Sequence, residues 1–290
     1  MGRENGTLVD LATQRWVRLT GRRTTRADTP WLDGPTGDTV GIGSDFFDRW
    51  ALREGFDVER DVGPRGLLPD FDQLAGPSFR PALIHPDVRR FYEETSEYDL
   101  EAWSEWSGAF RPFGWLLARL FSRRLQQLNV PLHPLDTSHG TVSEVLHLRH
   151  RSSEFVVMAA WIRHLRRTGH VLYAGSYSIA NVPGNPDPCV RVVFPLPNGN
   201  ATVLLKPLAE PDGALTVLSK GRTYGEPGFY FTVHSDDGRL WMRYVKTMRE
   251  SIRVYPAGNG DVRADHVMWI FGLVFLRLHY RMVRRDRSAG

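Results

Sequence analysis

Four Asn-Gly or Asp-Gly pairs divide the C-terminal half of this 290-residue chain into short apolar segments. They are Asn198-Gly199, Asp212-Gly213, Asp237-Gly238 and Asn259-Gly260. Asn, Asp and Gly tolerate the positive φ angles of type I′ turns, and the twist of these turns matches that of the strands they join. The pairs therefore predict consecutive β-hairpins, and we expect an antiparallel meander over residues 141–260.

The segments between the turns are rich in Val, Tyr, Phe and Thr, which favours strands over helices. Residues 154–167 fit both a strand and a helix, and the helix is favoured because apolar residues recur at helical spacing and arginines gather near its C-terminus. The strands are expected near residues 142–149, 170–180, 189–194, 201–206, 214–220, 228–234, 239–247 and 251–255.

Helices are predicted on both sides of the meander. Before it, cap residues and apolar spacing predict helices over 44–53, 86–95, 99–106 and 113–128. After it, Asp265 can cap a long apolar helix over 265–285. Residues 1–80 are rich in Gly, Pro, Asp and Thr, so we expect an irregular N-terminal arm whose aromatic residues pack on a single domain over 81–290.

The expected fold class is α+β. A curved antiparallel meander, closed as a barrel or open as a half-barrel, would be covered by helices within 86–130 and by the long C-terminal helix. In its order of elements this layout is similar to the helix-grip folds of lipid-binding proteins and polyketide cyclases, and less closely to lipocalin-like barrels. Many unrelated functions use such folds, so the fold alone predicts no activity.

Composition excludes some classes of protein. The most apolar stretch, residues 267–276, has about half of the roughly 20 residues that a membrane-spanning helix needs. The N-terminus lacks the apolar core of a secretory signal, so a cytoplasmic location is expected. The net charge is only +4, and the arginine pairs are scattered along the sequence. No specific nucleic-acid partner is expected, because such a partner needs a continuous basic face.

Sequence motifs for cofactors and covalent catalysis are absent, and no catalytic residue is assigned. His133, His139, His147 and His150 are close in sequence, but a loop and alternating strand faces separate them, so no metal is expected. Cys189 is the only cysteine. It opens an apolar strand and is expected to be a small core residue. The sequence likewise predicts no cofactor.

Polar residues inside strands are the candidates for ligand binding. Arg191 and Arg243 interrupt apolar strands, and a buried arginine needs a partner. These two arginines either lie on a solvent-exposed face of the sheet or line a cavity for an anionic or carbonyl ligand. Tyr177, Tyr230 and His234 are the other candidates to line such a cavity.

The expected function is the binding of a hydrophobic or polycyclic small molecule between sheet and helix, as in an isomerase or cyclase of secondary metabolism. The alternative is a protein without catalytic activity that binds a membrane surface or another protein. Two arginine-containing apolar segments, residues 113–125 and 271–285, have the composition of interfacial helices. The sequence predicts no oligomeric state.

Overall fold

In the computed structural model, the structure describes residues 8–37, 42–60, 63–108, 141–152, 155–166, 169, 171–235 and 239–285. Within these ranges three α-helices accompany a 14-stranded antiparallel sheet. The helices are α1 (Leu8–Thr20), α2 (Phe46–Glu54) and α3 (Pro86–Glu93). The strands are β1 (Arg22–Thr24), β2 (Phe56–Glu59), β3 (Tyr98–Trp106), β4 (Thr141–His150), β5 (Val156–Leu165), β6 (Val171–Ala180), β7 (Cys189–Leu196), β8 (Gly199–Ala209), β9 (Leu215–Leu218), β10 (Phe229–His234), β11 (Leu240–Tyr244), β12 (Met248–Gly258), β13 (Asp261–Ile270) and β14 (Leu273–Arg284).

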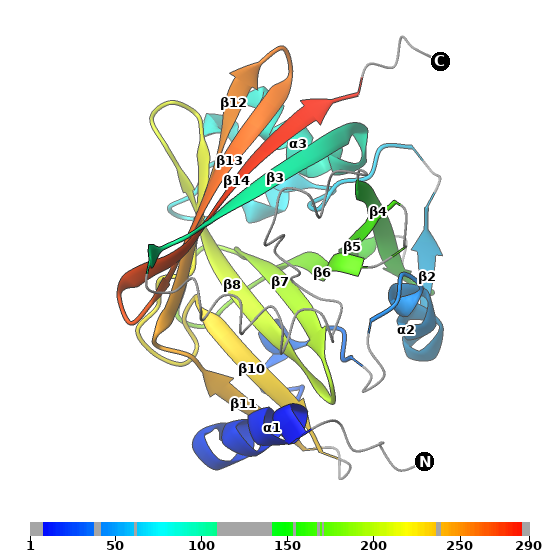
Figure 1. The fold of residues 1–290 in the computed structure, drawn as a ribbon, viewed down its shortest axis with the longest axis vertical. Coiled ribbons are helices and arrows are strands. Elements are labelled where there is room, and N and C mark those ends of the chain that lie inside the picture. The colour runs from blue at the N-terminus through cyan, green and yellow to red at the C-terminus, as the bar shows by residue number, and fades with distance from the viewer. Residues whose placement is uncertain are drawn as a thin grey trace.

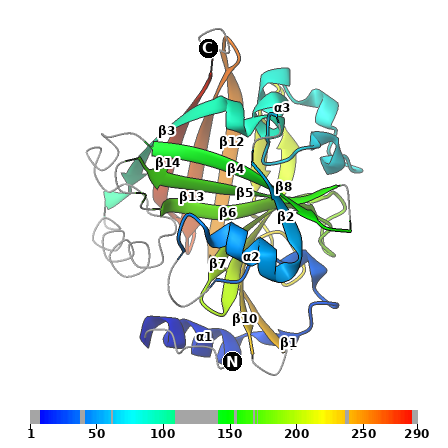
Figure 2. The same ribbon diagram turned by 90° about the vertical axis from the view of Figure 1, so that its right-hand side faces the viewer.

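Strand β8 divides the sheet into two halves. One edge of β8 pairs with β7, whereas the other edge pairs first with β10 and then with β9. The first half therefore contains β2 and β4 to β8, with β10, β11 and β1 continuing from β8. The second half runs from β9 through β12, β13 and β14 to β3. The two halves cross each other, as Figures 1 and 2 show.

The largest hydrophobic core lies between the two halves. Trp161 and Val192 from the first half share this core with Val254 and Met282 from the second. Helix α3 contributes Phe91 to the same core. We call the faces that meet here the inner faces of the sheet. Because strand residues alternate between faces, every second residue of these strands points into this interior.

Two smaller cores cover the outer face of the first half. Helix α2 packs Phe47 and Trp50 against residues of β4, β5 and β6 such as Ile162. The N-terminal segment packs Trp31 against Tyr230. Strands β4 to β8 are therefore buried on both faces, which explains their nearly continuous apolar sequences.

The predicted long C-terminal helix is absent, and the α+β class with a helix-covered sheet is wrong. Residues 265–285 form most of β13 and all of β14, two antiparallel strands of a mainly β structure. A two-residue turn, Phe271-Gly272, joins them, with φ angles of 51° and 81°. The apolar content that suggested a helix belongs to two paired strands.

Two other predicted helices are also strands. Residues 154–167 contain β5, whose apolar run reflects burial on both faces and not the single apolar stripe of a surface helix. Residues 99–106 belong to β3, whose burial alternates strictly along the strand. Here the period-2 pattern of Tyr98, Leu100 and Ala102 is the strand signal.

Other predictions are confirmed. Helices α2 and α3 lie where cap and apolar spacing placed them, and strands are present at the remaining expected positions. Asn259-Gly260 forms the predicted turn, with φ angles of 56° and 81°. At Asn198-Gly199 the hairpin is present, but only Asn198 has a positive φ. The predicted helix over 113–128 and the pair Asp237-Gly238 lie outside the described residues.

Candidate functional site

Polar side chains gather on the inner faces between the two halves of the sheet. Their strand positions alternate with core residues, so that Arg163 shares a face with Trp161, and Glu250 with Val254. We call this group the interior polar cluster. It consists of Arg163 from β5, Tyr173 and Tyr177 from β6, Glu250 from β12, His266 from β13 and Tyr280 from β14.

Two tyrosines of β6 form the centre of the cluster. The hydroxyl oxygens of Tyr173 and Tyr177 lie 2.5 Å apart in a hydrogen bond. Gly175 between them makes this contact possible, because a Cβ at that position would lie 3.0 Å from the Tyr173 hydroxyl. Trp161 packs against both rings, with centroids 5.5 Å and 6.0 Å away.

Both tyrosines are neutral at physiological pH. Burial raises the pKa of Tyr173 and Tyr177 above the ordinary value, because it disfavours the charged phenolate. Of the two O–H groups, one donates to the other oxygen, and the second is left to donate elsewhere. Both residues are half-buried rather than fully buried.

Arg163 lies directly opposite Tyr173 in the pairing of β5 with β6. Its Nε is buried and has no hydrogen-bond partner among the residues that the structure describes. Burial lowers the pKa of this guanidinium, and the groups that partly oppose this effect are Tyr280, Tyr173 and Tyr177. Within the described part of the chain, no carboxylate lies within 4.0 Å of it. A buried guanidinium without an ion-pair partner is costly.

The second half of the sheet contributes an acid–base pair. The Nε2 atom of His266 lies 2.9 Å from the Oε2 atom of Glu250, and their side chains are only 12% and 8% exposed. The His266 ring stacks on Tyr280, with centroids 6.4 Å apart. Burial raises the pKa of Tyr280 to about 12, and the negative charge of Glu250 adds to this increase while Arg163 opposes it.

The cluster thus combines a cation, neutral hydroxyl donors and a carboxylate–imidazole pair inside an apolar and aromatic interior. Arg163 and the tyrosines can donate hydrogen bonds to a carboxylate, sulfonate, phenolate or carbonyl oxygen. The Glu250–His266 pair can accept or return a proton. Among the described residues no group of three His, Cys, Asp or Glu side chains is arranged to hold a metal ion.

The structure separates the residues that the sequence singled out. Tyr177 is part of the interior polar cluster, whereas Arg191, Tyr230 and His234 lie on the outer face of the first half of the sheet. Arg243 lies opposite Phe231 in the pairing of β10 with β11, on the face that packs against Trp16 of α1. Arg191 donates hydrogen bonds to the Ser178 hydroxyl at 2.8 Å and to the Pro30 carbonyl at 3.0 Å. Burial lowers the pKa of Arg191. Its contacts fasten the N-terminal segment to the sheet.

Tyr230 and His234 share the outer face of β10. Tyr230 is buried beneath Trp31, and its hydroxyl donates to the Glu226 carbonyl at 2.6 Å. The Nε2 atom of His234 lies 3.4 Å from the Thr36 hydroxyl. Both residues therefore contact chain segments outside the interior.

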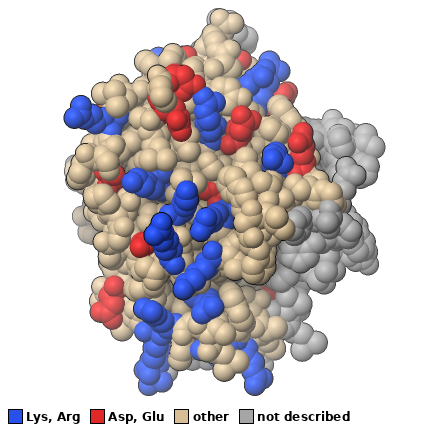
Figure 3. Space-filling view, turned by 90° about the vertical axis from the view of Figure 1, so that its left-hand side faces the viewer, with Lys and Arg blue, Asp and Glu red and all other residues tan. Residues whose placement is uncertain are grey.

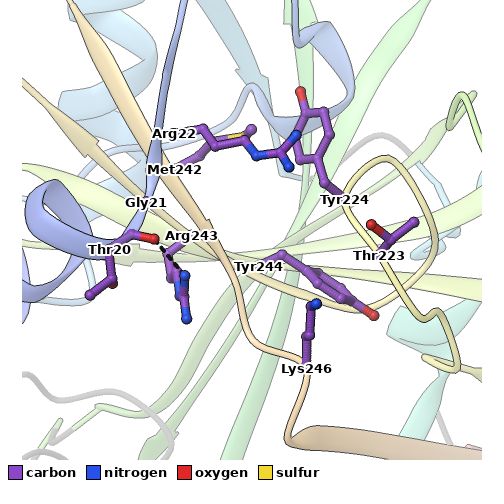
Figure 4. A pocket seen from close by; sticks show the side chains of 9 residues that line it. All are labelled: Thr20, Gly21, Arg22, Thr223, Tyr224, Met242, Arg243, Tyr244 and Lys246. Carbon is purple, nitrogen blue, oxygen red and sulfur yellow. Dashed lines mark hydrogen bonds between the residues drawn. The ribbon is translucent and has the colours of Figure 1, made fainter.

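Arg243 lines a shallow pocket of about 170 Å³ where α1, β1 and β11 meet. Figure 4 shows its guanidinium joined to the Thr20 carbonyl, while Arg22 extends toward Tyr224. Lys246 completes a set of three cations around this pocket. Figure 4 places Lys246 beside the ring of Tyr244.

Sequence reasoning missed five of the six residues of the interior polar cluster. Arg163 was assigned to a helix C-terminus, and His266 and Tyr280 to the C-terminal helix. The missed signal is the glycine of Phe271-Gly272, which divides a run of about 20 residues into two segments of strand length. Glu250 carries no local signal, because its neighbours come from other strands. Tyr173 had a local signal, because it lies four residues from Tyr177 in the same strand and therefore shares its face.

The fold and the interior polar cluster define an antiparallel β-sheet protein with an aromatic-lined polar interior. A stretch of 248 residues, 84% of the chain, is 25% identical to the protein named "Uncharacterized membrane protein YndJ" of Bacillus subtilis (strain 168). The chain spans 43% of the length of that protein. No protein-family model matches the chain, and no solved structure matches it. None of the described helices is long and apolar enough to cross a bilayer.

Proposed function

We propose that the chain binds a largely apolar small molecule between the two halves of its sheet and holds one anionic or carbonyl oxygen of that molecule with Arg163. The observation behind this proposal is the buried guanidinium nitrogen, next to three tyrosines, that has no hydrogen-bond partner within the described part of the chain. A ligand oxygen would supply the missing acceptor. Aromatic groups such as Trp161 and Phe194 would contact the apolar body of the ligand.

The second part of this proposal is proton transfer between the Glu250–His266 pair and the bound molecule. The Glu250–His266 pair faces the same interior, and the negative charge of Glu250 contributes to the raised pKa of Tyr280 and Tyr173. A carbonyl compound whose oxygen is held by Arg163 would become more acidic at the neighbouring carbon. Removal and return of that proton is the chemistry of an isomerase or a cyclase. Ligand binding is the more general claim and is tested first.

Two fluorescent probes of similar shape test the role of the cation. One is 1-anilinonaphthalene-8-sulfonate, which is anionic, and the other is N-phenyl-1-naphthylamine, which is neutral. Arg163→Met should weaken binding of the sulfonate about tenfold or more, because a hydrogen bond to a charged group contributes roughly 1.5–3 kcal/mol. Affinity for the neutral probe should stay within about twofold of the wild type.

The matched control is Arg281→Met. Arg281 is exposed on the outer face of β14 and pairs with Glu101. It should leave the affinity for both probes unchanged. The proposal fails if Arg163→Met weakens both probes equally, if it weakens neither, or if the wild type binds neither probe.

A tyrosine variant tests the hydrogen-bond geometry. Tyr177→Phe removes one of the two hydroxyls, so the remaining Tyr173 hydroxyl loses its partner in the pair. Binding of the sulfonate should weaken about fivefold, since one hydrogen bond contributes about 1 kcal/mol. Equal affinity in the variant and the wild type would exclude the tyrosine pair from the ligand site.

A further inference from the structure

The turn between β13 and β14 exposes a cluster of apolar side chains. Phe271 is 76% exposed and Leu273 is 61% exposed, although both are large and hydrophobic. Phe271 also has a φ of 51°. This left-handed conformation is unfavourable for a bulky residue and is normally left to Gly, Asn or Asp.

A second turn in this chain has the same backbone conformation but a different first residue. Between β12 and β13, Asn259-Gly260 has φ angles of 56° and 81°. Phe271-Gly272 has φ angles of 51° and 81° but carries phenylalanine instead of asparagine. The aromatic ring therefore costs turn stability and gains little burial against the described residues. A strained and exposed apolar residue indicates a contact outside the chain.

Cations lie next to this turn. The backbone N–H of Phe271 donates to the Thr247 carbonyl at 2.9 Å, which holds the turn against the connection between β11 and β12. Lys246 precedes Thr247, and Arg249 follows at the start of β12, opposite Trp269. Both cations are exposed, and among the described residues neither has a carboxylate within 4.0 Å.

The basic surface extends beyond the turn. Lys246 also lines the pocket that contains Arg22 and Arg243 (Figure 4). Figure 3 shows lysine and arginine side chains gathered over the middle and lower part of this face, while most acidic side chains lie higher. The β13–β14 turn lies on this left-hand side of Figure 1. An apolar tip thus lies beside a cationic surface.

Charge complementarity favours an anionic bilayer over a second copy of the chain as the partner of this surface. A second copy of the chain bound at the same face would bring like charges together, which is unfavourable. An anionic bilayer satisfies both features, because its hydrocarbon receives apolar side chains and its phosphates attract nearby lysine and arginine. Trp269 adds an aromatic side chain of the type that is enriched at bilayer interfaces.

We propose that the β13–β14 turn inserts Phe271 and Leu273 into the headgroup region of an anionic lipid bilayer, with Lys246 and Arg249 contacting lipid phosphates. The surface lies on the outside of the second half of the sheet and does not depend on the interior polar cluster. The relative's printed name, a membrane protein, supports this proposal.

Vesicle flotation tests the proposal. The full chain should bind vesicles of phosphatidylcholine mixed with phosphatidylglycerol at low salt, and it should bind pure phosphatidylcholine vesicles much more weakly. Phe271→Asn should lower the affinity about tenfold, because a phenylalanine side chain no longer leaves water. This variant should also melt at a higher temperature than the wild type, which separates loss of binding from loss of folding.

Matched controls use residues with similar exposure elsewhere. Phe155→Ser changes an aromatic side chain that is 80% exposed on the β4–β5 connection, and it should leave vesicle affinity unchanged. The double variant Lys246→Gln with Arg249→Gln should lower affinity about tenfold or more, at about 1 kcal/mol for each cation. The double variant Arg253→Gln with Arg285→Gln changes arginines that already pair with Asp212 and Asp99. This second double variant should change vesicle affinity only slightly.

Three results would overturn the proposal. The first is no flotation with anionic vesicles at low salt. The second is equal affinity of Phe271→Asn and Phe155→Ser. The third is a wild-type dimer in size-exclusion chromatography that Phe271→Asn dissociates without any change in flotation, because the turn would then be a contact between copies of the chain.

Discussion

The backbone of Phe271 repeats that of Asn259, with φ angles of 51° and 56°, and each residue is followed by a glycine at 81°. One position carries a residue suited to the left-handed conformation, and the other carries a residue that the conformation penalises. The two turns join consecutive pairs of strands in the same half of the sheet. They provide an internal comparison between a turn residue that serves folding and one that serves an external contact.

Exchange of the two residue types should change stability in opposite directions. Phe271→Asn should raise the free energy of unfolding by about 1 kcal/mol, and Asn259→Phe should lower it by about 1 kcal/mol, since a left-handed conformation costs roughly 1–2 kcal/mol for an ordinary residue. Urea denaturation monitored by circular dichroism measures both changes. A destabilised Phe271→Asn variant would show that the aromatic ring stabilises the turn.

Removal of the Arg163 guanidinium should stabilise the fold while it weakens ligand binding. Arg163→Met replaces a buried cation by an apolar side chain of similar length, so the free energy of unfolding should rise by about 1–3 kcal/mol. Arg281→Met, at an exposed position, should change it by less than about 0.5 kcal/mol. Chemical denaturation without ligand measures both. A loss of stability in Arg163→Met would assign the guanidinium a structural role.

Acid should destabilise the protein through His147. This side chain is 8% exposed, and its Nε2 donates to the Gly66 carbonyl at 2.9 Å. Burial lowers the pKa of His147 below the ordinary value of 6.5, because it disfavours the charged imidazolium. The unfolded chain therefore binds a proton more readily than the folded chain, so stability is full above about pH 6.5 and falls as pH decreases below it.

The variant His147→Gln isolates this effect. Glutamine keeps a hydrogen-bond donor but does not titrate, so its free energy of unfolding should depend less on pH between about 7 and 5 than that of the wild type. Denaturant titrations across this range measure the two slopes. Parallel slopes would show that His147 titrates alike in the folded and unfolded chain.

The thiol of Cys189 should be unreactive in the folded protein. The residue is fully buried, and burial raises the pKa of its thiol to about 12. Because the thiolate is the reactive form, iodoacetamide at mildly alkaline pH should leave the native chain unmodified and alkylate it once in denaturant. Mass spectrometry distinguishes the two cases. Rapid modification of the native chain would contradict the core position expected from the sequence.

The strands and turns of the meander were predictable because their signals are local. Asn259 and its glycine predicted a turn, and the alternating or β-branched segments on each side predicted strands. The errors have a common cause. Strand β5 is buried on both faces and therefore lacks the alternation of a half-buried strand, so its apolar run was compatible with a helix. The β13–β14 turn was not predicted, because phenylalanine is rarely found at a turn position with a positive φ.

The candidate site was less predictable than the fold. Tyr177 was selected as a polar residue within a strand, and it does face the interior. Its partners could not be selected, because Arg163 and Tyr280 are distant in sequence and their common environment depends on how the two halves of the sheet cross. Arg191 and Tyr230 gave equally strong sequence signals, yet they lie under the N-terminal segment. A polar residue in a strand indicates that one face is unusual, but it does not indicate which face.

The sequence by itself determined the hairpins, most of the strands and the short helices α2 and α3, because turn geometry, cap residues and residue alternation act over a few neighbouring positions. Only the tertiary structure decided which face of each strand meets the other half of the sheet. That choice depends on long-range pairing and on the division of the sheet at β8. It placed Arg163 among the tyrosines of the interior and left Phe271 in solvent beside Lys246.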